Sequence, residues 1–332
     1  MASMKDVAKL AGVSVSTVSR VINNTVPVDE NTRKKVQSAI KKTNYRPNLL
    51  ARGLRSKSGH LIGLVVPEIM QSAFASFIEY TEMSVTRRGL DLIVGNTRND
   101  PDIEERFIDS LMRRNIDGII FSRVSDKSHI LHILDRGEIP VVIMDRVVGD
   151  EKNPTVVLDN YLAGRLAAEH LIGLGHKKFA CIAGKIEVGL FRDRLKGFQE
   201  TLLEHGIILE DKAIYRGETE YQTGKDAVDY FLSKQIEMTA LWAECDLVAI
   251  GAMEQLKRNH INIPNGISVV GVDDLDISAI VYPSLTTIAQ PFAEMCDVAV
   301  QMVLDQKNGI EIEERKVVLE PKLVVRESTK AV

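Results

Sequence analysis

The chain has 332 residues, of which 45% are hydrophobic and 27% charged, and it carries a net charge of −4 at pH 7. These values are typical of a globular protein of two or three domains and exclude a disordered or fibrous chain. No run approaches the roughly 18 apolar residues of a membrane span, and the first residues show no apolar stretch followed by a cleavage site, which predicts no signal peptide.

The charge is distributed unevenly along the chain. Residues 1–60 contain 12 Lys and Arg but only 3 Asp and Glu, whereas the remainder is acidic. A basic head on an acidic body indicates that the head alone meets a polyanion such as DNA. Three widely separated cysteines, Cys181, Cys245 and Cys296, predict neither a disulfide framework nor a zinc site, and favour a reducing cytoplasm.

The head begins with two short predicted helices, residues 4–11 and residues 15–23. Gly12 between them suits the left-handed residue that ends a helix, and Ser14 can cap the second one. Two such helices joined by a glycine-containing turn are typical of a helix-turn-helix, whose second helix reaches base edges in the major groove.

Within this motif we expect Val18 and Val21 to pack back onto Val7 and Leu10. Arg20 can donate two hydrogen bonds to a guanine, while Val15 can only touch a thymine methyl or exclude a base. The hydroxyls that follow Val15 could serve a base or a phosphate. The candidate base- and phosphate-contacting residues are Val15, Ser16, Thr17, Ser19, Arg20 and Asn23.

A third helix is predicted over residues 30–44, where Val36, Ala39 and Ile40 close a small core. After it, Asn48 can cap a short helix that reaches about residue 55. Such a helix is marginal alone, so we expect it to form against DNA and a partner chain, with Leu54 as an apolar wedge in the minor groove.

From residue 60 on, short apolar runs alternate with amphipathic segments, which predicts a parallel sheet covered by helices on both faces. A second such series begins near residue 159. Two doubly wound halves create a cleft, and ligands bind such folds at the carboxyl ends of strands. Strands are predicted at 60–66, 90–95, 117–121, 139–144, 179–182, 241–243 and 269–272, and helices at 74–88, 104–113, 162–174, 194–205, 223–233, 247–259 and 292–304.

Polar residues just past these strands are candidate ligand contacts. A guanidinium and a carboxylate together can hold the vicinal hydroxyls of a sugar. We expect Arg194 and Asp273 to be the central pair, although each residue taken singly is more often a solvated loop or salt-bridge residue. The candidates from strand ends are Arg123, Asp145, Arg192, Arg194 and Asp273.

The head resembles the DNA-binding domain of the LacI/GalR family of bacterial transcriptional repressors. The resemblance rests on DVAKLAGVSVSTVSRVINN, TRKKV, NYRPN and LLARGL, and in the body on GHKKFACIAG, GISVVGVDD and PSLTTIAQP. It implies a palindromic operator, a dimer and a hinge helix that folds on DNA, with base readout at Val15, Ser16 and Arg20, and minor-groove contacts at Leu54 and Arg55.

For the body, the resemblance implies a periplasmic-binding-protein-like core of two doubly wound parallel-sheet subdomains. The expected domains are a helix-turn-helix at 1–47, a hinge at 48–59, one subdomain at 60–158 plus 289–320, a second at 159–288, and a tail at 321–332. It also implies effector contacts at Arg194 and Asp273, and an aromatic ring at Phe74 over the ligand.

This sequence departs from the family pattern at two cleft positions. Cys245 replaces a common asparagine, and Thr219 stands where many relatives have an aromatic residue. Both changes weaken any transfer of ligand identity from a relative. Arg123 adds a positive charge near the cleft, which either favours an acidic or phosphorylated sugar or simply orients hydroxyls.

The sequence therefore predicts a cytoplasmic, nucleoid-associated, dimeric repressor controlled by a small effector, with a sugar or sugar derivative as the expected class, and with no cofactor and no metal. Three alternatives remain open: a regulator whose core answers to a protein co-effector, a sugar-binding transport protein, and an enzyme. The basic head argues against a transport protein. An enzyme is disfavoured because the chain lacks G-x-G-x-x-G after the first strand, a P-loop, G-x-S-x-G and H-E-x-x-H.

No leucine heptad follows the tail, which favours a dimer over a tetramer.

Overall fold

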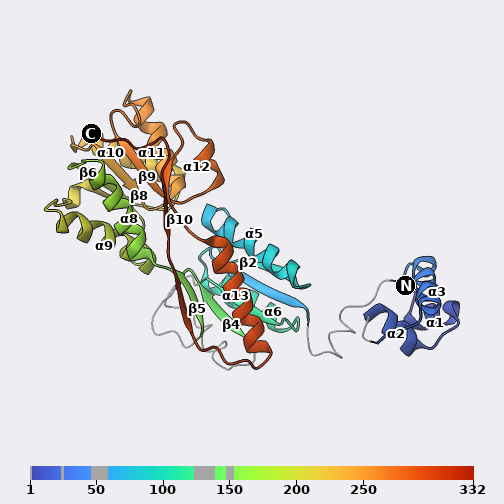
Figure 1. The fold of residues 1–332 in the computed structure, drawn as a ribbon. Helices are drawn as coiled ribbons and strands as arrows, with labels where there is room; N and C mark the ends of the chain where they lie inside the picture. Colours follow the sequence, from blue (N-terminus) through green and yellow to red (C-terminus); the bar gives the residue numbers. More distant parts are fainter. Residues whose placement is uncertain (1, 24–25, 46–58, 123–138, 147–152) are drawn as a thin grey trace. The chain divides into compact units, whose positions relative to one another are not determined.

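The computed structural model describes residues 2–23, 26–45, 59–122, 139–146 and 153–332. The chain divides into two compact units, Met1–Gly59 and His60–Val332, which we call the head and the body (Figure 1). The predicted hinge helix with Leu54 and Arg55, the residue Arg123, and the side chain of Asn23 lie outside the described residues.

The head contains three helices, α1 (Met4–Ala11), α2 (Val15–Asn23) and α3 (Glu30–Thr43). Ser3 and Asp6 form a capping box at the start of α1, and Gly12, with φ +66°, ends it in the left-handed conformation that glycine adopts without strain. The predicted cap of α2 is confirmed, because the Thr17 N–H donates to Ser14 Oγ at 3.1 Å. The helices meet in a core of Val7, Ala8, Val18, Val21, Val36 and Ala39.

One packing prediction in the head is wrong. Leu10 is 53% exposed and does not belong to the core that holds Val7, Val18 and Val21. The apolar stripe of α1 instead runs through Met4, Val7, Ala8 and Ala11, which is the i, i+3, i+4, i+7 spacing of one helix face. Leu10 lies off that stripe.

The first sheet of the body has the strand order β11-β5-β4-β3-β1-β2, with every neighbouring pair parallel. Three of its strands, β3, β4 and β5, are buried along their whole length because helices cover both faces of a parallel sheet. Its strands are β1 (Leu61–Val66), β2 (Asp91–Asn96), β3 (Gly118–Phe121), β4 (Val141–Met144), β5 (Thr155–Leu158) and β11 (Lys316–Leu319).

Helices α5 (Ser72–Arg87) and α13 (Phe292–Lys307) pack on one face of this sheet, and α6 (Pro101–Met112) packs on the other. Successive residues of one strand alternate between the two cores. Leu64 and Val66 belong to the α5–α13 core, and Val65 belongs to the α6 core. The core assignment of α13 is confirmed, since Met295, Ala299 and Val303 are completely buried.

The second sheet has the order β12-β10-β9-β8-β6-β7 and is parallel except for the β10–β12 pair. Helices α8 (Asn160–Gly173) and α9 (Gly189–Glu204) cover one face, and α10 (Tyr221–Ser233) and α11 (Asp246–Arg258) cover the other. Its strands are β6 (Phe179–Ala183), β7 (Ile214–Arg216), β8 (Ala240–Ala243), β9 (Ser268–Asp273), β10 (Thr286–Ala289) and β12 (Lys322–Val324), with a 3-10 turn at Asp211–Ala213 and α12 at Asp276–Ile280.

The chain passes between the two sheets three times, after β5, after β10 and after β11. In Figure 1, β10 and the C-terminal strand run alongside each other in the upper half, while α13 lies in the lower half. The end of the chain is tied down, because fully buried Ser328 donates to the Val269 carbonyl at 2.6 Å and accepts from the Thr286 N–H.

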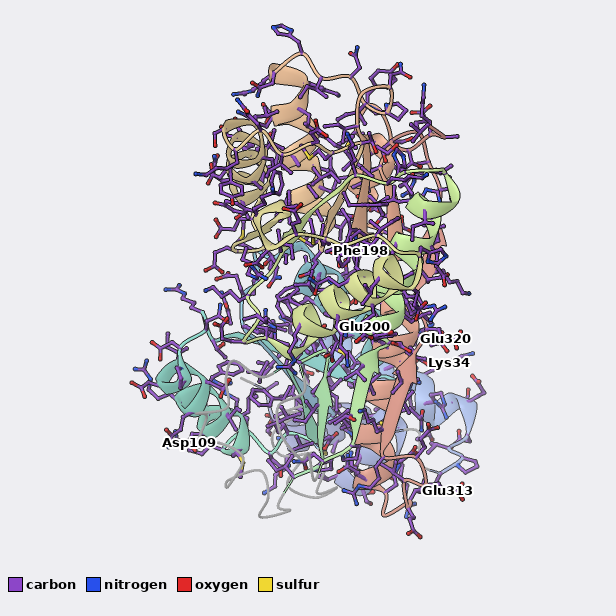
Figure 2. The ribbon with its side chains drawn as sticks, turned by 90° about the vertical axis from the view of Figure 1, so that its left-hand side faces the viewer. Lys34, Asp109, Phe198, Glu200, Glu313 and Glu320 are labelled. Atoms are coloured by element: carbon purple, nitrogen blue, oxygen red, sulfur yellow. The ribbon has the colours of Figure 1, made fainter. Side chains whose placement is uncertain are left out.

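The second half is built around one aromatic stack. Phe198 of α9 stacks on Trp242 of β8 with ring centroids 4.4 Å apart, and both side chains are completely buried. Glu200, two residues further along α9, lies on the exposed face of the helix, and Figure 2 labels both residues. Across the described residues, no helix is both long and apolar enough to span a membrane.

Candidate functional site: a DNA-reading helix and a ligand cleft

Helix α2 presents a polar surface on the side away from the head's core. Val18 and Val21 are buried, whereas Arg20 and Ser16 are exposed and Val15 is 41% exposed. Since residues one or two apart on a helix face different directions, this leaves the predicted reading residues free to meet another molecule. Thr17 and Ser19 are partly buried at the edge of the same surface.

The hydroxyls at the start of α2 form a small hydrogen-bonded group in the head. Ser14 Oγ lies 2.8 Å from both Ser16 Oγ and Thr17 Oγ1. These hydroxyls sit at a helix N-terminus, where backbone N–H groups and the helix dipole favour a negatively charged partner. A DNA phosphate is such a partner.

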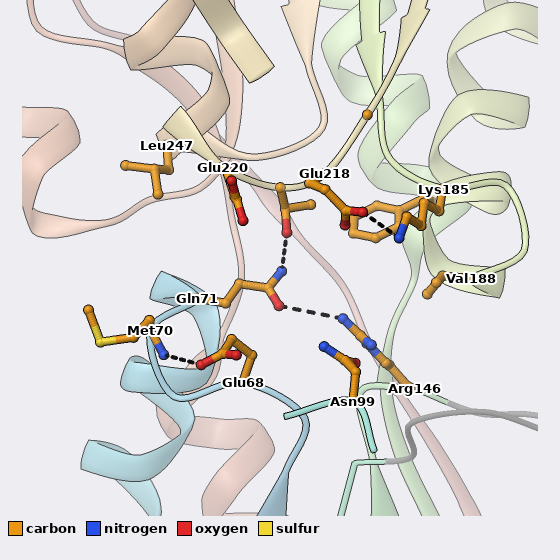
Figure 3. A pocket seen from close by; sticks show the side chains of 13 residues that line it. Glu68, Met70, Gln71, Asn99, Arg146, Lys185, Val188, Glu218, Glu220 and Leu247 are labelled. Atoms are coloured by element: carbon orange, nitrogen blue, oxygen red, sulfur yellow. Dashed lines mark hydrogen bonds and ion pairs between the residues drawn. The ribbon is translucent and has the colours of Figure 1, made fainter. Parts of the chain in front are cut away.

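The body contains a cavity of about 660 Å³ between its two halves, which we call the outer chamber (Figure 3). One wall comes from the loops after β1 and β4 and carries Glu68, Gln71 and Arg146. The opposite wall comes from the loops after β6 and β7 and carries Lys185 and the run Gly217–Glu220. These are the carboxyl ends of the strands, as expected for this fold.

Gln71, the residue before α5, reaches across the cleft. Its Nε2 donates to Thr219 Oγ1 at 2.7 Å, and its Oε1 accepts from Arg146 Nη2 at 3.5 Å (Figure 3). Gln71 lines both the outer chamber and a smaller cavity of about 20 Å³, which we call the inner pocket. The two halves of the body are thus joined by a hydrogen bond that crosses the cleft between them.

The inner pocket contains the predicted central pair, Arg194 and Asp273. Arg194 is only 2% exposed; its Nε donates to Asn160 Oδ1 at 2.8 Å and its Nη1 to the Glu244 carbonyl at 2.7 Å. Asp273 Oδ1 accepts from Gln290 Nε2 at 2.6 Å. Burial raises the pKa of Asp273 to about 8, against the opposing effect of the Arg194 charge.

Asp145, Arg146 and Phe74 form the other side of the inner pocket. Arg146 Nε lies 4.0 Å from Asp145 Oδ2, and its guanidinium lies 5.3 Å from the centre of the Phe74 ring. Phe74 is 2% exposed and packs at 6.1 Å against Phe77, so most of its ring belongs to the core. Burial raises the pKa of the Asp145 carboxyl, because few polar groups there solvate its charge.

Both strand-end carboxylates of the pocket have left-handed backbone conformations. Asp145 has φ +68° and Asp273 has φ +128°. A non-glycine residue in these regions costs on the order of 1–3 kcal/mol, and such strain is concentrated at binding sites. Both aspartates of the inner pocket therefore carry the kind of backbone strain that accompanies binding sites.

The remaining predicted cleft residues fall in three different places. Thr219 lines the outer chamber and Cys245, at the start of α11, lines the inner pocket. Arg192 lines neither cavity: it is exposed and lies 3.8 Å from its neighbour Asp193. Two residues along a helix turn a side chain by roughly 200°, so Arg192 and Arg194 point to opposite sides of α9.

Several cleft residues were missing from the sequence prediction, namely Glu68, Gln71, Arg146, Lys185, Glu218, Glu220 and Gln290. Arg146 and Gln290 had a usable signal, because each lies just past a strand, beside a predicted residue or motif. Gln71 had none, since its role depends on Thr219 lying opposite. Among the described residues, no group of three His, Cys, Asp or Glu side chains could hold a metal.

Comparisons with known proteins agree with both parts of this architecture. A family model described as bacterial regulatory proteins of the lacI family matches residues 3–48, and one described as a periplasmic binding protein-like domain matches residues 168–329. The ribose operon repressor of Escherichia coli K12 is 32% identical over 329 residues, which are 99% of this chain and 100% of the relative.

Solved structures give the same result. A lac repressor dimer bound to operator and the anti-inducer ONPF aligns with a TM-score of 0.88 and 28% identity, covering 99% of each chain. A complex of the transcriptional regulator CelR with cellobiose aligns with a TM-score of 0.75 and 29% identity, covering 99% of this chain and 100% of the other.

A helix-turn-helix head joined to a two-sheet, cleft-containing body defines a ligand-responsive class of DNA-binding regulators. The chain belongs to the lacI family of bacterial regulatory proteins. It is a DNA-binding transcriptional repressor with a periplasmic-binding-protein-like body, and it is not an enzyme.

Proposed function

We propose that this repressor binds a pseudo-palindromic operator as a dimer, and that a small polyhydroxylated effector in the cleft changes its affinity for DNA. It would act in the bacterial cytoplasm, on the nucleoid. The observation that carries the proposal is the surface of α2, where Val15, Ser16 and Arg20 are exposed over a core of Val18 and Val21. Such a helix can enter the major groove while its opposite face stays packed.

Arg20 is the main base-reading residue in this proposal. A bidentate Arg–guanine contact contributes about 1–3 kcal/mol of base discrimination, so Arg20→Ala should lose roughly 10- to 100-fold preference at one base pair of each half-site. Selection of bound DNA from a random pool, compared between the parent and the variant, measures this loss position by position.

Lys41→Ala is the matched control, because Lys41 is an exposed cation on α3 of the same head. Removal of a lysine that contacts only phosphates should weaken binding to all DNA sequences alike and leave the selected site unchanged. An Arg20→Ala protein that selects the parental site with undiminished preference would rule out Arg20 as a base reader.

The dimer and the two-fold operator are tested in the same experiment. A symmetric dimer places two equal heads on two half-sites, so the selected sequence should be an inverted repeat. Sedimentation of the free protein at micromolar concentration should show twice the chain mass. A selected site without two-fold symmetry contradicts the dimeric proposal.

The effector part of the proposal rests on the cleft. The 660 Å³ chamber is within the range of about 300–1,000 Å³ that holds small-molecule ligands. It opens between two halves that are joined across it by Gln71 and Thr219. A ligand that binds one arrangement of the halves better than another shifts their equilibrium by that difference in affinity. A change of operator affinity upon adding ligand is the expected result.

A further inference from the structure

The charges that line the cleft indicate which class of ligand it accepts. This inference rests on the proposed function and goes beyond it. The outer chamber is lined by three carboxylates, Glu68, Glu218 and Glu220, and by two cations, Arg146 and Lys185. Figure 3 shows Glu220 and Glu68 on either side of the Gln71 side chain, which extends into the chamber. A negatively charged ligand group placed here meets an excess of like charge among the described residues.

The three described cations that line the two cavities already have neighbours. Lys185 forms an ion pair with Glu218 (Figure 3). Arg146 lies beside Asp145 and over the Phe74 ring. Arg194 of the inner pocket donates to Asn160 and to the Glu244 carbonyl. A phosphate is held in proteins by cations and N–H donors that converge on it. Lys185 and Arg194 would first have to leave a partner, and Arg146 offers an unpartnered buried donor, its Nε atom.

Polar atoms that lack partners indicate what the ligand can offer instead. The Oε1 atom of Gln290 is buried without a hydrogen bond, while the amide nitrogen of the same side chain donates to Asp273. The Nε atom of Arg146 is a buried donor that also lacks a partner. A hydroxyl group can donate to the first and accept from the second, whereas a phosphate dianion can only accept.

The inner pocket also disfavours charge. Burial raises the pKa of both its aspartates, Asp145 and Asp273, because the surroundings solvate a negative charge poorly. The same surroundings would penalise a phosphate that entered the pocket. Its volume of about 20 Å³ admits one polar group of a ligand, while the bulk of the ligand must occupy the 660 Å³ outer chamber.

We propose that the cleft binds an uncharged polyhydroxylated compound of disaccharide size, with one hydroxyl group reaching Gln290 and Arg146, and that it rejects the phosphorylated form of the same compound. Glu220 is the residue that sets this preference. Among the described residues it forms no ion pair, and it lines the outer chamber opposite Glu68. No described side chain neutralises its charge, so a phosphate in the chamber would meet it directly.

The test is calorimetric titration of the full-length protein with four neutral disaccharides, cellobiose, maltose, lactose and sucrose, each beside its 6-phosphate. At least one neutral sugar should bind, and its phosphate should bind at least about tenfold more weakly, since like charges a few ångströms apart repel strongly where water is partly excluded. Tighter binding of the phosphate, or no binding by any neutral member, overturns the inference.

Charge reversal at Glu220 adds a second measurement. Glu220→Lys should improve binding of the phosphorylated sugar by about tenfold. Glu105→Lys on α6 is the matched control, an exposed glutamate that lines neither cavity, and it should leave the ratio of the two affinities unchanged. If both variants change the ratio equally, Glu220 does not set the preference.

Operator binding by the same preparation separates the two levels of the proposal. Gel-shift assays report DNA binding without any sugar. Protein that binds operator but prefers the phosphorylated sugars overturns only the inference about the ligand. Protein that binds sugars but no DNA sequence specifically overturns the proposed function.

Discussion

Replacing Gly197 by alanine is expected to lower the free energy of unfolding of the body by about 3 kcal/mol, because overpacking that meets backbone cannot be relieved by a rotamer change. A Cβ atom at Gly197 would lie 2.0 Å from the Tyr161 carbonyl oxygen, and one at Gly164 would lie 1.9 Å from that of Arg194. Helices α8 and α9 thus cross in close backbone contact, and either change forces them apart.

The consequence reaches the ligand cleft through Arg194. This residue lies on α9 next to the crossing point, and its own carbonyl contacts Gly164. If α9 moves outward, the Arg194 guanidinium leaves its bonds to Asn160 and Glu244. Gly197→Ala should therefore also weaken ligand binding, whereas operator recognition by the head should survive under conditions in which the body remains folded.

Urea denaturation of the parent and the variant measures the stability loss. Gly173→Ala is the control: it lies at the end of α8, where an added Cβ meets nothing within 4 Å. Alanine is favoured over glycine in a helix by up to about 1 kcal/mol, so this variant should be as stable as the parent or slightly more stable. An unfolding midpoint of Gly197→Ala equal to that of Gly173→Ala would contradict the close-crossing argument.

The α10–α11 pair repeats the arrangement on the opposite face of the second sheet. Cβ atoms at Gly224 and Gly251 would lie 2.0 Å from the carbonyl oxygens of Val248 and Tyr221. Both helix pairs of this half therefore rely on two facing glycines.

The second large effect is expected from Glu244, in the form of a pH dependence of stability. Its side chain is 2% exposed, with Oε2 accepting from the Gly184 N–H at 2.7 Å and Oε1 without a partner. Burial raises the pKa of Glu244 from 4.5 to about 8, although the Gly184 N–H and the charges of Arg194 and Arg216 oppose the shift. The folded body therefore holds this proton more tightly than the unfolded chain does.

The sign follows from proton linkage. Well below pH 4.5 the Glu244 carboxyl is protonated in both the folded and the unfolded state, so it makes no pH-dependent contribution to the free energy of unfolding. Between pH 4.5 and about 8 the unfolded chain releases the proton while the folded body retains it, so stability falls as pH rises. Above pH 8 both states are ionised and the loss is complete, at about 3–5 kcal/mol for a shift of this size.

Glu244→Gln removes the ionisation and retains an oxygen for the Gly184 N–H. The variant should be close to the parent at pH 5 and more stable than the parent at pH 8.5, which urea denaturation at the two pH values measures. Glu237→Gln is the control, because Glu237 is exposed, pairs with Lys178, and has a lowered pKa. It should not gain stability at pH 8.5. If the stability of Glu244→Gln depends on pH as the parent's does, the folded protein does not keep the Glu244 carboxyl protonated.

The head shows how far a sequence pattern predicts a structure. The caps at Ser14 and Gly12 and the buried positions Val18 and Val21 are local features, and the structure agrees with them. Leu10 was predicted wrongly because hydrophobicity alone does not say which face of a helix as short as α1 is buried. That choice depends on where α2 and α3 lie, and not on α1 itself.

In the body, the sequence placed the longer strands and helices within a few residues, but it did not define β5, β7, β10 or the start of α9. The N-terminal turns of α5, α8, α9, α10 and α11 were predicted to begin between one and five residues late. These first turns are polar or irregular in hydrophobic pattern. They carry Asn160 and the residues before Arg194, and Gln71 directly precedes the first turn of α5; the cleft uses all of these.

Arg20 on an exposed helix face could be selected from the sequence alone, because a helix-turn-helix is a local motif and its reading face is defined by residues within nine positions of one another. The cleft could be predicted only as a set of strand ends. Which side chains meet there was decided by the tertiary structure: Gln71 and Thr219 are 148 residues apart in the chain, yet they share a hydrogen bond of 2.7 Å. The charge of the ligand chamber and the buried acid Glu244 arise in the same way, because burial and unpaired hydrogen-bonding atoms are properties of the packed molecule and not of any single segment.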